Sequence, residues 1–118
     1  MFDQFTLDKY TELAMRTAKD MGTEQMNLIH AALGISSDAG ELVDAIKKHV
    51  IYRKPLDMEN VLEEIGDCLW FLALAANTLG VPLSMIAMNN IGKLAKRYPE
   101  KYSDEAAIAR ADKADGAT

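Results

Sequence analysis

Several features that mark particular protein classes are scarce in this sequence of 118 residues. Cys68 is the only cysteine, which excludes an internal disulfide and a thiolate metal cage and favours a reducing compartment. The longest uninterrupted apolar run, residues 68–76, is about half of what a bilayer span requires. The N-terminus also lacks the basic start and apolar stretch of a secretory signal. We therefore expect a cytoplasmic protein with no membrane partner.

Positive charge is in deficit as well. The chain carries 13 lysines and arginines against 18 aspartates and glutamates, a formal net charge of -5. A protein that binds a nucleic-acid backbone presents a basic face, so we expect no nucleic-acid partner. An acidic excess serves solubility, but carboxylate oxygens are also the ligands that hard cations such as Mg²⁺ prefer. Net charge alone leaves both uses open.

The alternation of apolar and polar residues that is typical of strands is absent, and helical spacing takes its place. Thr6 is a suitable cap for a first helix that runs to about Asp20, and glycine at position 22 suits the turn after it. Asp57 and Gly80 bracket a third helix in the same way. The expected helices span residues 6–20, 24–49, 57–79 and 82–97, followed by a short alanine-rich helix after Ser103.

This pattern predicts one all-α domain, a bundle of four or five helices. We expect the domain to cover residues 1–103 and a polar, alanine-rich tail to cover residues 104–118. The third helix is polar in its first half and apolar nearly all round from Cys68 to Ala76. A helix that is apolar on every side must be buried on every side. In so small a domain, we expect dimerisation to complete the bundle.

Two acidic segments with the same pattern lie on consecutive expected helices. They are residues 38–41, Asp-Ala-Gly-Glu, and residues 64–67, Glu-Ile-Gly-Asp. Residues three apart share a helix face, so each segment points two carboxylates in one direction at a repulsive cost of a few tenths of a kcal/mol. At about 1.5 Å per residue, both segments lie about 10–12 Å from the turn of an antiparallel hairpin. Four carboxylates should therefore face one another across the two helices: Asp38, Glu41, Glu64 and Asp67.

The glycine in each segment, Gly40 and Gly66, costs about 1 kcal/mol relative to alanine in mid-helix. We expect such a residue where a neighbouring helix or a ligand approaches the backbone closely.

Four convergent carboxylates without histidine or cysteine suit Mg²⁺ or Mn²⁺ rather than zinc. Such ions bind phosphate oxygens and acidify a bound water, which points to hydrolysis of phosphate esters or anhydrides. Glu63, beside Glu64, is a candidate general base. A di-iron bundle would require Glu-x-x-His pairs, and neither His30 nor His49 has an acidic residue three positions before it. The alternative that these carboxylates are only solvated surface stays open at this stage.

Together with their neighbours, these segments resemble the MazG-like all-alpha nucleoside triphosphate pyrophosphohydrolases. That superfamily also includes all-alpha dUTPases, dCTP pyrophosphatases and phosphoribosyl-ATP pyrophosphohydrolases. The family pattern is Glu-Glu-x-x-Glu followed by Glu-x-x-Asp. The second part matches at residues 64–67, but the first part departs, because Ser37 and Asp38 stand where two glutamates are usual. The resemblance runs from about residue 28 to residue 103 and rests on residues 37–42, 52–56, 62–70, 79–83, 90–94 and 97–99.

The resemblance implies hydrolysis of a nucleoside or deoxynucleoside triphosphate to the monophosphate and pyrophosphate. It implies Mg²⁺, with Mn²⁺ as a substitute, held by the four carboxylates named above, and catalytic roles for Glu63 and Glu64. It also implies a homodimer or a homotetramer built as a dimer of dimers. The candidate substrate contacts are Lys48, Lys54, Trp70, Asn90, Lys93 and Arg97.

Four of these contacts have a structural alternative. Trp70 has core-type neighbours, Arg97 with Tyr98 suits a helix end, and Asn90 with Lys93 could form a solvated face. For the whole chain, the alternative function is a catalytically silent helical module that binds a nucleotide or a partner. A purely structural interaction protein is a third possibility. The sequence does not distinguish among the bases.

Overall fold

The computed structural model describes residues 4–113, which form helices and turns with no strand among them. The prediction of an all-α fold is therefore confirmed. The chain divides into two compact units, Met1–Leu83 and Ser84–Thr118. The first contains α1 (Leu7–Ala14), the short 3-10 helix η1 (Met15–Thr17), α2 (Glu24–Val50) and α3 (Met58–Leu79). The second contains most of α4 (Leu83–Arg97), then α5 (Asp104–Ala109) and the 3-10 helix η2 (Ala111–Lys113).

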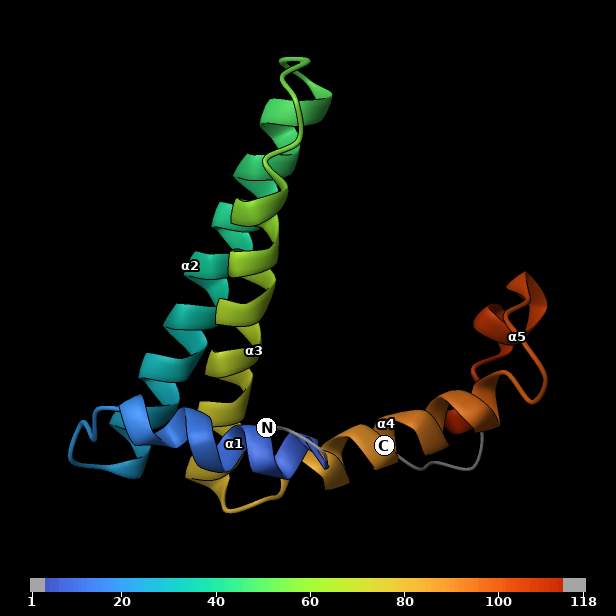
Figure 1. Cartoon of the computed structure of the whole chain (residues 1–118). Helices are drawn as coiled ribbons and strands as arrows, with labels where there is room; N and C mark the ends of the chain where they lie inside the picture. Colours follow the sequence, from blue (N-terminus) through green and yellow to red (C-terminus); the bar gives the residue numbers. More distant parts are fainter. Residues whose placement is uncertain (1–3, 114–118) are drawn as a thin grey trace. The chain divides into compact units, whose positions relative to one another are not determined.

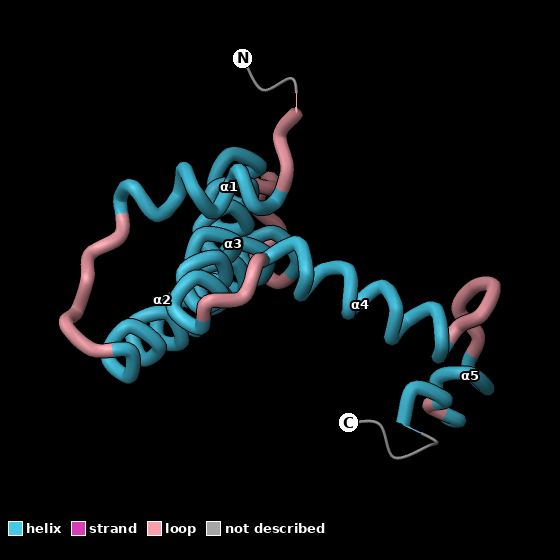
Figure 2. Tube along the Cα trace, turned by 90° about the horizontal axis from the view of Figure 1, so that it is seen from below, coloured by secondary structure: helices cyan, strands magenta, loops and turns pink. Residues whose placement is uncertain are grey.

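The first unit is built on an antiparallel hairpin of α2 and α3, with α1 crossing the end opposite the connecting loop (Figure 1 and Figure 2). The polar residues predicted as caps set the helix ends. Thr23 accepts a hydrogen bond from the Met26 N–H at 3.1 Å, and Asp57 accepts one from the Asn60 N–H at 3.1 Å. Gly80 ends α3 with φ 72°, a left-handed conformation that glycine adopts without a steric penalty.

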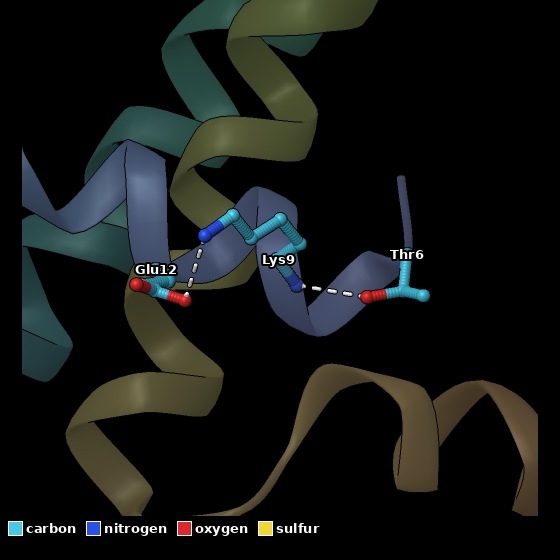
Figure 3. A network of polar contacts seen from close by, with 3 residues as sticks. All are labelled: Thr6, Lys9 and Glu12. Atoms are coloured by element: carbon cyan, nitrogen blue, oxygen red, sulfur yellow. Dashed lines mark hydrogen bonds and ion pairs between the residues drawn. The ribbon is translucent and has the colours of Figure 1, made fainter. Parts of the chain in front are cut away.

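Helix α1 begins as predicted but ends early. Thr6 caps it by accepting from the Lys9 N–H at 3.0 Å, and Lys9 forms an exposed ion pair with Glu12 (Figure 3). The expected extension to Asp20 is wrong, because α-helix stops at Ala14. The Ala14 carbonyl accepts hydrogen bonds from the Thr17 hydroxyl at 2.9 Å and from an indole N–H of α3 at 3.1 Å. The Ala14 carbonyl would accept the N–H of residue 18 if the α-helix continued. Because other donors occupy that carbonyl, the chain continues as the tighter 3-10 helix η1.

The core of the first unit is small. Its buried apolar residues include Ala31, Ala45, Ala73 and Leu74, and no large side chain in the described part of the chain is completely buried. Close packing of α2 on α3 depends on Gly34, because a Cβ at that position would lie 2.3 Å from the Phe71 ring. Many large apolar side chains stay exposed on both helices. A single copy of the hairpin therefore leaves much of its apolar surface in solvent.

In the second unit, α5 and η2 are tied to the end of α4. Ser103 caps α5 as predicted, accepting from the Ala106 N–H at 3.1 Å. The Arg97 guanidinium donates to both carboxylate oxygens of Asp112, at 2.8 and 3.1 Å. The tail predicted over residues 104–118 is thus helical as far as Lys113, and residues 114–118 lie outside the described part. The predicted domain division after residue 103 stays a prediction.

Within residues 4–113, no individual helix combines the length and the apolar character needed to cross a membrane, although α3 and α4 meet that test when they are counted together.

Candidate metal centre

The hairpin brings three of the four predicted metal ligands together. Asp38 and Glu41 project from α2 and Glu64 from α3, and each offers one carboxylate oxygen within 4.8 Å of the others. We refer to these three residues as the acidic cluster. Asp38 is half-buried, Glu41 is exposed and Glu64 is buried. The three carboxylates meet because the i, i+3 pair on α2 lies at the same height along the hairpin as Glu64.

Glu64 is the most unusual member of the acidic cluster. Its side chain is 7% exposed, and its Oε2 atom is buried without a hydrogen-bond partner. The pKa of Glu64 is raised to about 7, first by burial, then by a hydrogen bond with Glu41 and by the negative charges of Glu41, Asp38 and Asp67. The pKa of Asp38 is also raised, mainly by burial and then by Asp67 and Glu41. No described cation offsets this concentration of negative charge at either carboxyl.

These residues fit a hard divalent cation. The donor set is made only of oxygen atoms, which Mg²⁺ and Mn²⁺ prefer. A buried oxygen without a partner costs free energy unless a hydrogen-bond donor or a cation satisfies it. A cation among the three oxygens would also reverse the repulsion that raises their pKa values. Asp38, Glu41 and Glu64 are therefore the residues that would hold it.

Asp67, the fourth predicted ligand, lies outside this group of three. It is exposed, one turn beyond Glu64 on α3, and its charge raises the pKa values of Asp38, Glu64, Tyr10 and Cys68. Asp67 thus borders the acidic cluster and adds to its negative potential. Its role as a direct ligand stays a prediction.

The two glycines of the acidic segments are not required by packing inside the chain. A Cβ at Gly40 or Gly66 would meet no heavy atom within 4 Å. Of the two expected causes, the approach of a neighbouring helix of the described chain is therefore wrong, and the approach of a ligand stays a prediction. In the hairpin, that close approach occurs at Gly34 instead.

Glu63, the predicted general base, is exposed on α3. Successive residues on a helix point about 100° apart, so its side chain leaves α3 in a different direction from that of Glu64. It is not among the three grouped carboxylates, and its catalytic role stays a prediction.

Two predicted phosphate contacts lie at the loop end of the hairpin. Lys48 forms an exposed ion pair with Asp44 at 2.9 Å, and Lys47 lies 3.7 Å from the same carboxylate. Lys54 is exposed in the connecting loop, where its N–H donates to the Lys48 carbonyl at 3.2 Å. Its own carbonyl lies 2.8 Å from Nδ1 of His49, which must be the donor. Both lysines therefore lie on the loop side of the acidic cluster.

Trp70 is positioned on the other side of the acidic cluster, where it anchors α1. Its indole N–H donates to the Ala14 carbonyl at 3.1 Å and to the Thr17 hydroxyl at 3.2 Å. Its ring meets Phe71 edge-on, with centroids 5.0 Å apart. This arrangement corresponds to the packing alternative for Trp70, because its only polar atom is already paired.

The remaining predicted contacts lie in the second unit. Asn90 and Lys93 are exposed on α4, three residues apart. Arg97 is different, since its guanidinium is only 17% exposed and is paired with Asp112. The sequence predicts phosphate or a helix-end partner for Arg97, and the pairing with Asp112 is a finding of the structure. Asp112 is one of three aspartates in the alanine-rich tail, and nothing in their spacing identifies it as the partner of Arg97.

Comparisons with known proteins cover the region that holds the acidic residues. Residues 28–102, more than half of the chain, match the model of the MazG nucleotide pyrophosphohydrolase domain. The chain is 30% identical over 74 residues to the "Gene 37 protein" of Mycobacterium phage L5, covering 59% of this chain and 65% of that protein. The match thus spans slightly less than two thirds of the relative. No solved structure matches the chain significantly.

Proposed function

Since the chain belongs to the MazG nucleotide pyrophosphohydrolase domain family, we propose that it hydrolyses a nucleoside or deoxynucleoside triphosphate to the monophosphate and pyrophosphate in the presence of Mg²⁺. Members of this family are nucleoside triphosphate pyrophosphohydrolases and generally depend on divalent metal ions. The observation that carries the proposal is the acidic cluster, with three carboxylate oxygens within 4.8 Å and a buried, unpartnered oxygen of Glu64.

The acidic cluster has to bind the metal ion that accompanies the triphosphate. When bound, Mg²⁺ would neutralise phosphate oxygens and acidify a water molecule. Asp38, Glu41 and Glu64 each supply one oxygen, and Glu64 gives up the proton that its raised pKa lets it hold near neutral pH. Asp67 adds a fourth carboxylate one turn away. Mn²⁺ is the expected substitute, since it takes the same oxygen ligands.

The reaction adds one water across the anhydride between the α- and β-phosphates. Glu63 accepts a proton from the attacking water, and the bond between the α-phosphorus and the bridging oxygen breaks to release pyrophosphate. Lys48 and Lys54 offset phosphate charge from the loop side of the hairpin. Asn90, Lys93 and Arg97 are further proposed contacts, of which Arg97 must exchange its carboxylate partner for phosphate. Trp70 contributes by holding α1 in position.

The active form is proposed to be a homodimer or homotetramer. An apolar groove of about 580 Å³ runs along the second half of α2, lined by Leu42, Val43, Ile46, Lys47, Val50 and Ile51. Val43, Val50 and Ile51 are each more than 60% exposed, an amount of apolar surface that favours association. A monomer by light scattering at micromolar concentration would contradict this proposal. The substrate class favours a cytoplasmic location.

The experiment that tests the function is pyrophosphate release from a panel of nucleoside and deoxynucleoside triphosphates, with Mg²⁺, with Mn²⁺ and with EDTA. We expect pyrophosphate rather than orthophosphate, and no release in EDTA. Glu41→Gln should remove the activity, whereas Asp44→Asn is a matched control. Asp44 lies three residues further along α2, but it is paired with Lys47 and Lys48. Metal-dependent nucleotide binding without any turnover would favour the catalytically silent module instead.

A further inference from the structure

Helix α1 is held against α3 in a defined register. The Trp70 indole N–H donates to Ala14 and Thr17, and these two residues share a helical face with Tyr10, which precedes them by one and two turns. On α3, Asp67 lies one turn before Trp70. Two faces therefore meet, one carrying Tyr10, Ala14 and Thr17 and the other carrying Asp67 and Trp70.

This packing brings Tyr10 within electrostatic range of Asp67 at the edge of the acidic cluster. The pKa of the Tyr10 hydroxyl is raised, first by burial and then by the charge of Asp67. A phenol hydroxyl is protonated at neutral pH and can donate a hydrogen bond. The ring is half-buried and meets Phe5 edge-on, with centroids 6.3 Å apart and planes at 82°. Tyr10 thus presents an oriented aromatic ring and a donor, both outside the region matched to the family, residues 28–102.

The surroundings of the acidic cluster differ along the hairpin. Toward the loop, the side chains are cationic, with Lys47, Lys48 and Lys54. Toward α1, they are aromatic, with Tyr10 and Phe71 beside the Trp70 tether. A nucleoside triphosphate is polarised in the same way, with a charged phosphate end and an aromatic base. A substrate that followed this match would have its terminal phosphates toward the loop and its nucleoside toward α1.

We propose that Tyr10 is a specificity-determining residue that contacts the nucleoside part of the substrate while the acidic cluster holds the metal ion and the phosphates. The inference rests on the proposed function for the location of the phosphates. The Tyr10 ring supplies a stacking surface that accepts any base, and its hydroxyl donates to an acceptor on the base or sugar. The stacking contact provides affinity for a nucleoside of any base. The hydrogen bond from the hydroxyl makes that affinity differ from one base to another.

The test compares a ligand that has a nucleoside with one that lacks it. Calorimetry would measure the binding of each deoxynucleoside triphosphate and of inorganic tripolyphosphate, all with Mg²⁺, and pyrophosphate release would give KM and kcat. For Tyr10→Ala we expect about a 10-fold or greater loss of affinity and a matching rise in KM for every nucleotide, the size of a base–aromatic stacking contact. Tripolyphosphate binding should change less than about twofold, because it makes no such contact. Tyr10→Phe should keep the affinity for most nucleotides and alter the ranking among bases.

Two controls separate this role from a structural one. Tyr52→Ala removes a tyrosine that is 59% exposed in the loop at the opposite end of the hairpin, and should leave the ratio of nucleotide affinity to tripolyphosphate affinity unchanged. Trp70 is the only tryptophan and its indole binds α1, so its fluorescence reports whether α1 stays docked in the Tyr10 variants. If Tyr10→Ala undocks α1, the deciding measurement is the order of affinities among the nucleotides in Tyr10→Phe. That measurement requires that the Trp70 emission of Tyr10→Phe equals that of the wild type.

The possible outcomes are distinct. Equal losses for nucleotides and tripolyphosphate, or no loss for either, would overturn the role of Tyr10 while leaving the reaction in place. An unchanged base ranking in Tyr10→Phe would overturn the role of its hydroxyl. A wild-type protein that releases no pyrophosphate but binds nucleotides in a Tyr10-dependent manner would overturn the proposed function and support the contact.

Discussion

Two buried carboxylates, one in each unit of the chain, have opposite surroundings. Glu64 in the hairpin is 7% exposed and Asp112 near the C-terminal end is 6% exposed, and they are the buried charged residues of the described part of the chain. The pKa of Glu64 is raised to about 7 by burial and by neighbouring carboxylates. The pKa of Asp112 is lowered to about 2, chiefly by its hydrogen bonds to Arg97.

The contrast distinguishes a structural carboxylate from a functional one. Burial penalises a lone charge in both places, but the fold offsets that penalty at Asp112 with a guanidinium that binds both oxygens. At Glu64 it places two more carboxylates nearby and leaves one oxygen unpaired. The second arrangement is the one expected where a cation from outside the chain completes the site. Substitutions at Glu64 and Asp112 test this contrast directly.

The largest effect is expected for catalysis in Glu64→Gln. The amide keeps the size of the side chain but removes a negatively charged ligand, so pyrophosphate release should fall by at least about 100-fold, beyond the loss typical of groups that only support a ligand. The measurement is kcat/KM with Mg²⁺ at pH 8. Unchanged activity would remove Glu64 from the metal centre and with it the main support for the contrast.

The next effect concerns stability. Replacing the carboxylate by the corresponding amide should lower Tm at Asp112 but not at Glu64. Asp112→Asn leaves Arg97 without its charged partner and should lower Tm by several degrees, since breaking a buried pair is costly. Glu64→Gln should leave Tm unchanged or raise it in EDTA, because it removes repulsion among like charges. Thermal unfolding of both variants in EDTA measures this, and equal losses of Tm would show that the two sites do not differ.

A smaller effect is expected from pH. Between about pH 4.5 and about 7, folded Glu64 binds a proton that the unfolded chain does not. The free energy of unfolding of the metal-free protein should therefore decrease as pH rises through this window. Asp112 acts in the reverse direction, since it stabilises the fold above about pH 4 and that contribution is lost toward pH 2.

Thermal unfolding across pH with EDTA, and again with Mg²⁺, separates these contributions. Mg²⁺ should remove the decrease between pH 4.5 and 7 and raise Tm increasingly toward pH 8, because it competes with the Glu64 proton. A decrease of the same size in Glu64→Gln would show that another group titrates.

The smallest effect is expected for the exposed pair between Lys48 and Asp44, with 56% and 48% of the side chains exposed. Solvent screens such a pair, so Lys48→Met should leave Tm unchanged within error. For activity, Lys48→Met should raise KM a few-fold at low salt, because the lysine offsets phosphate charge. This rise should disappear at high salt, because salt screens that interaction. A rise in KM that salt does not alter would instead place Lys48 in direct contact with phosphate.

Most of the fold was predictable because local rules decide it. Thr6, Asp57, Gly80 and Ser103 each act at the helix end where their side chain or backbone suited a cap. The failure at Ala14 has a tertiary cause, since an indole 56 residues away takes its carbonyl. The helix propensities of the residues in α1 contain no information about the Trp70 indole.

The candidate site shows the same division. Repeated carboxylate pairs at helical spacing and similar depth indicated that Asp38, Glu41 and Glu64 would converge, because helix geometry alone sets their heights. Spacing did not indicate that Asp67 lies apart from that group, or that Arg97 is held by Asp112. The placement of Tyr10 beside Asp67 also depends on how α1 docks.

Caps, apolar periodicity and a repeated acidic pattern are local properties of the chain, so the positions of most helices and the convergence of three carboxylates could be predicted from them. Which of those carboxylates are buried, and which charges are paired, could not be predicted from local patterns. Burial and pairing depend on contacts between residues far apart along the chain. Those contacts give Glu64 and Asp112 pKa values on opposite sides of their ordinary range.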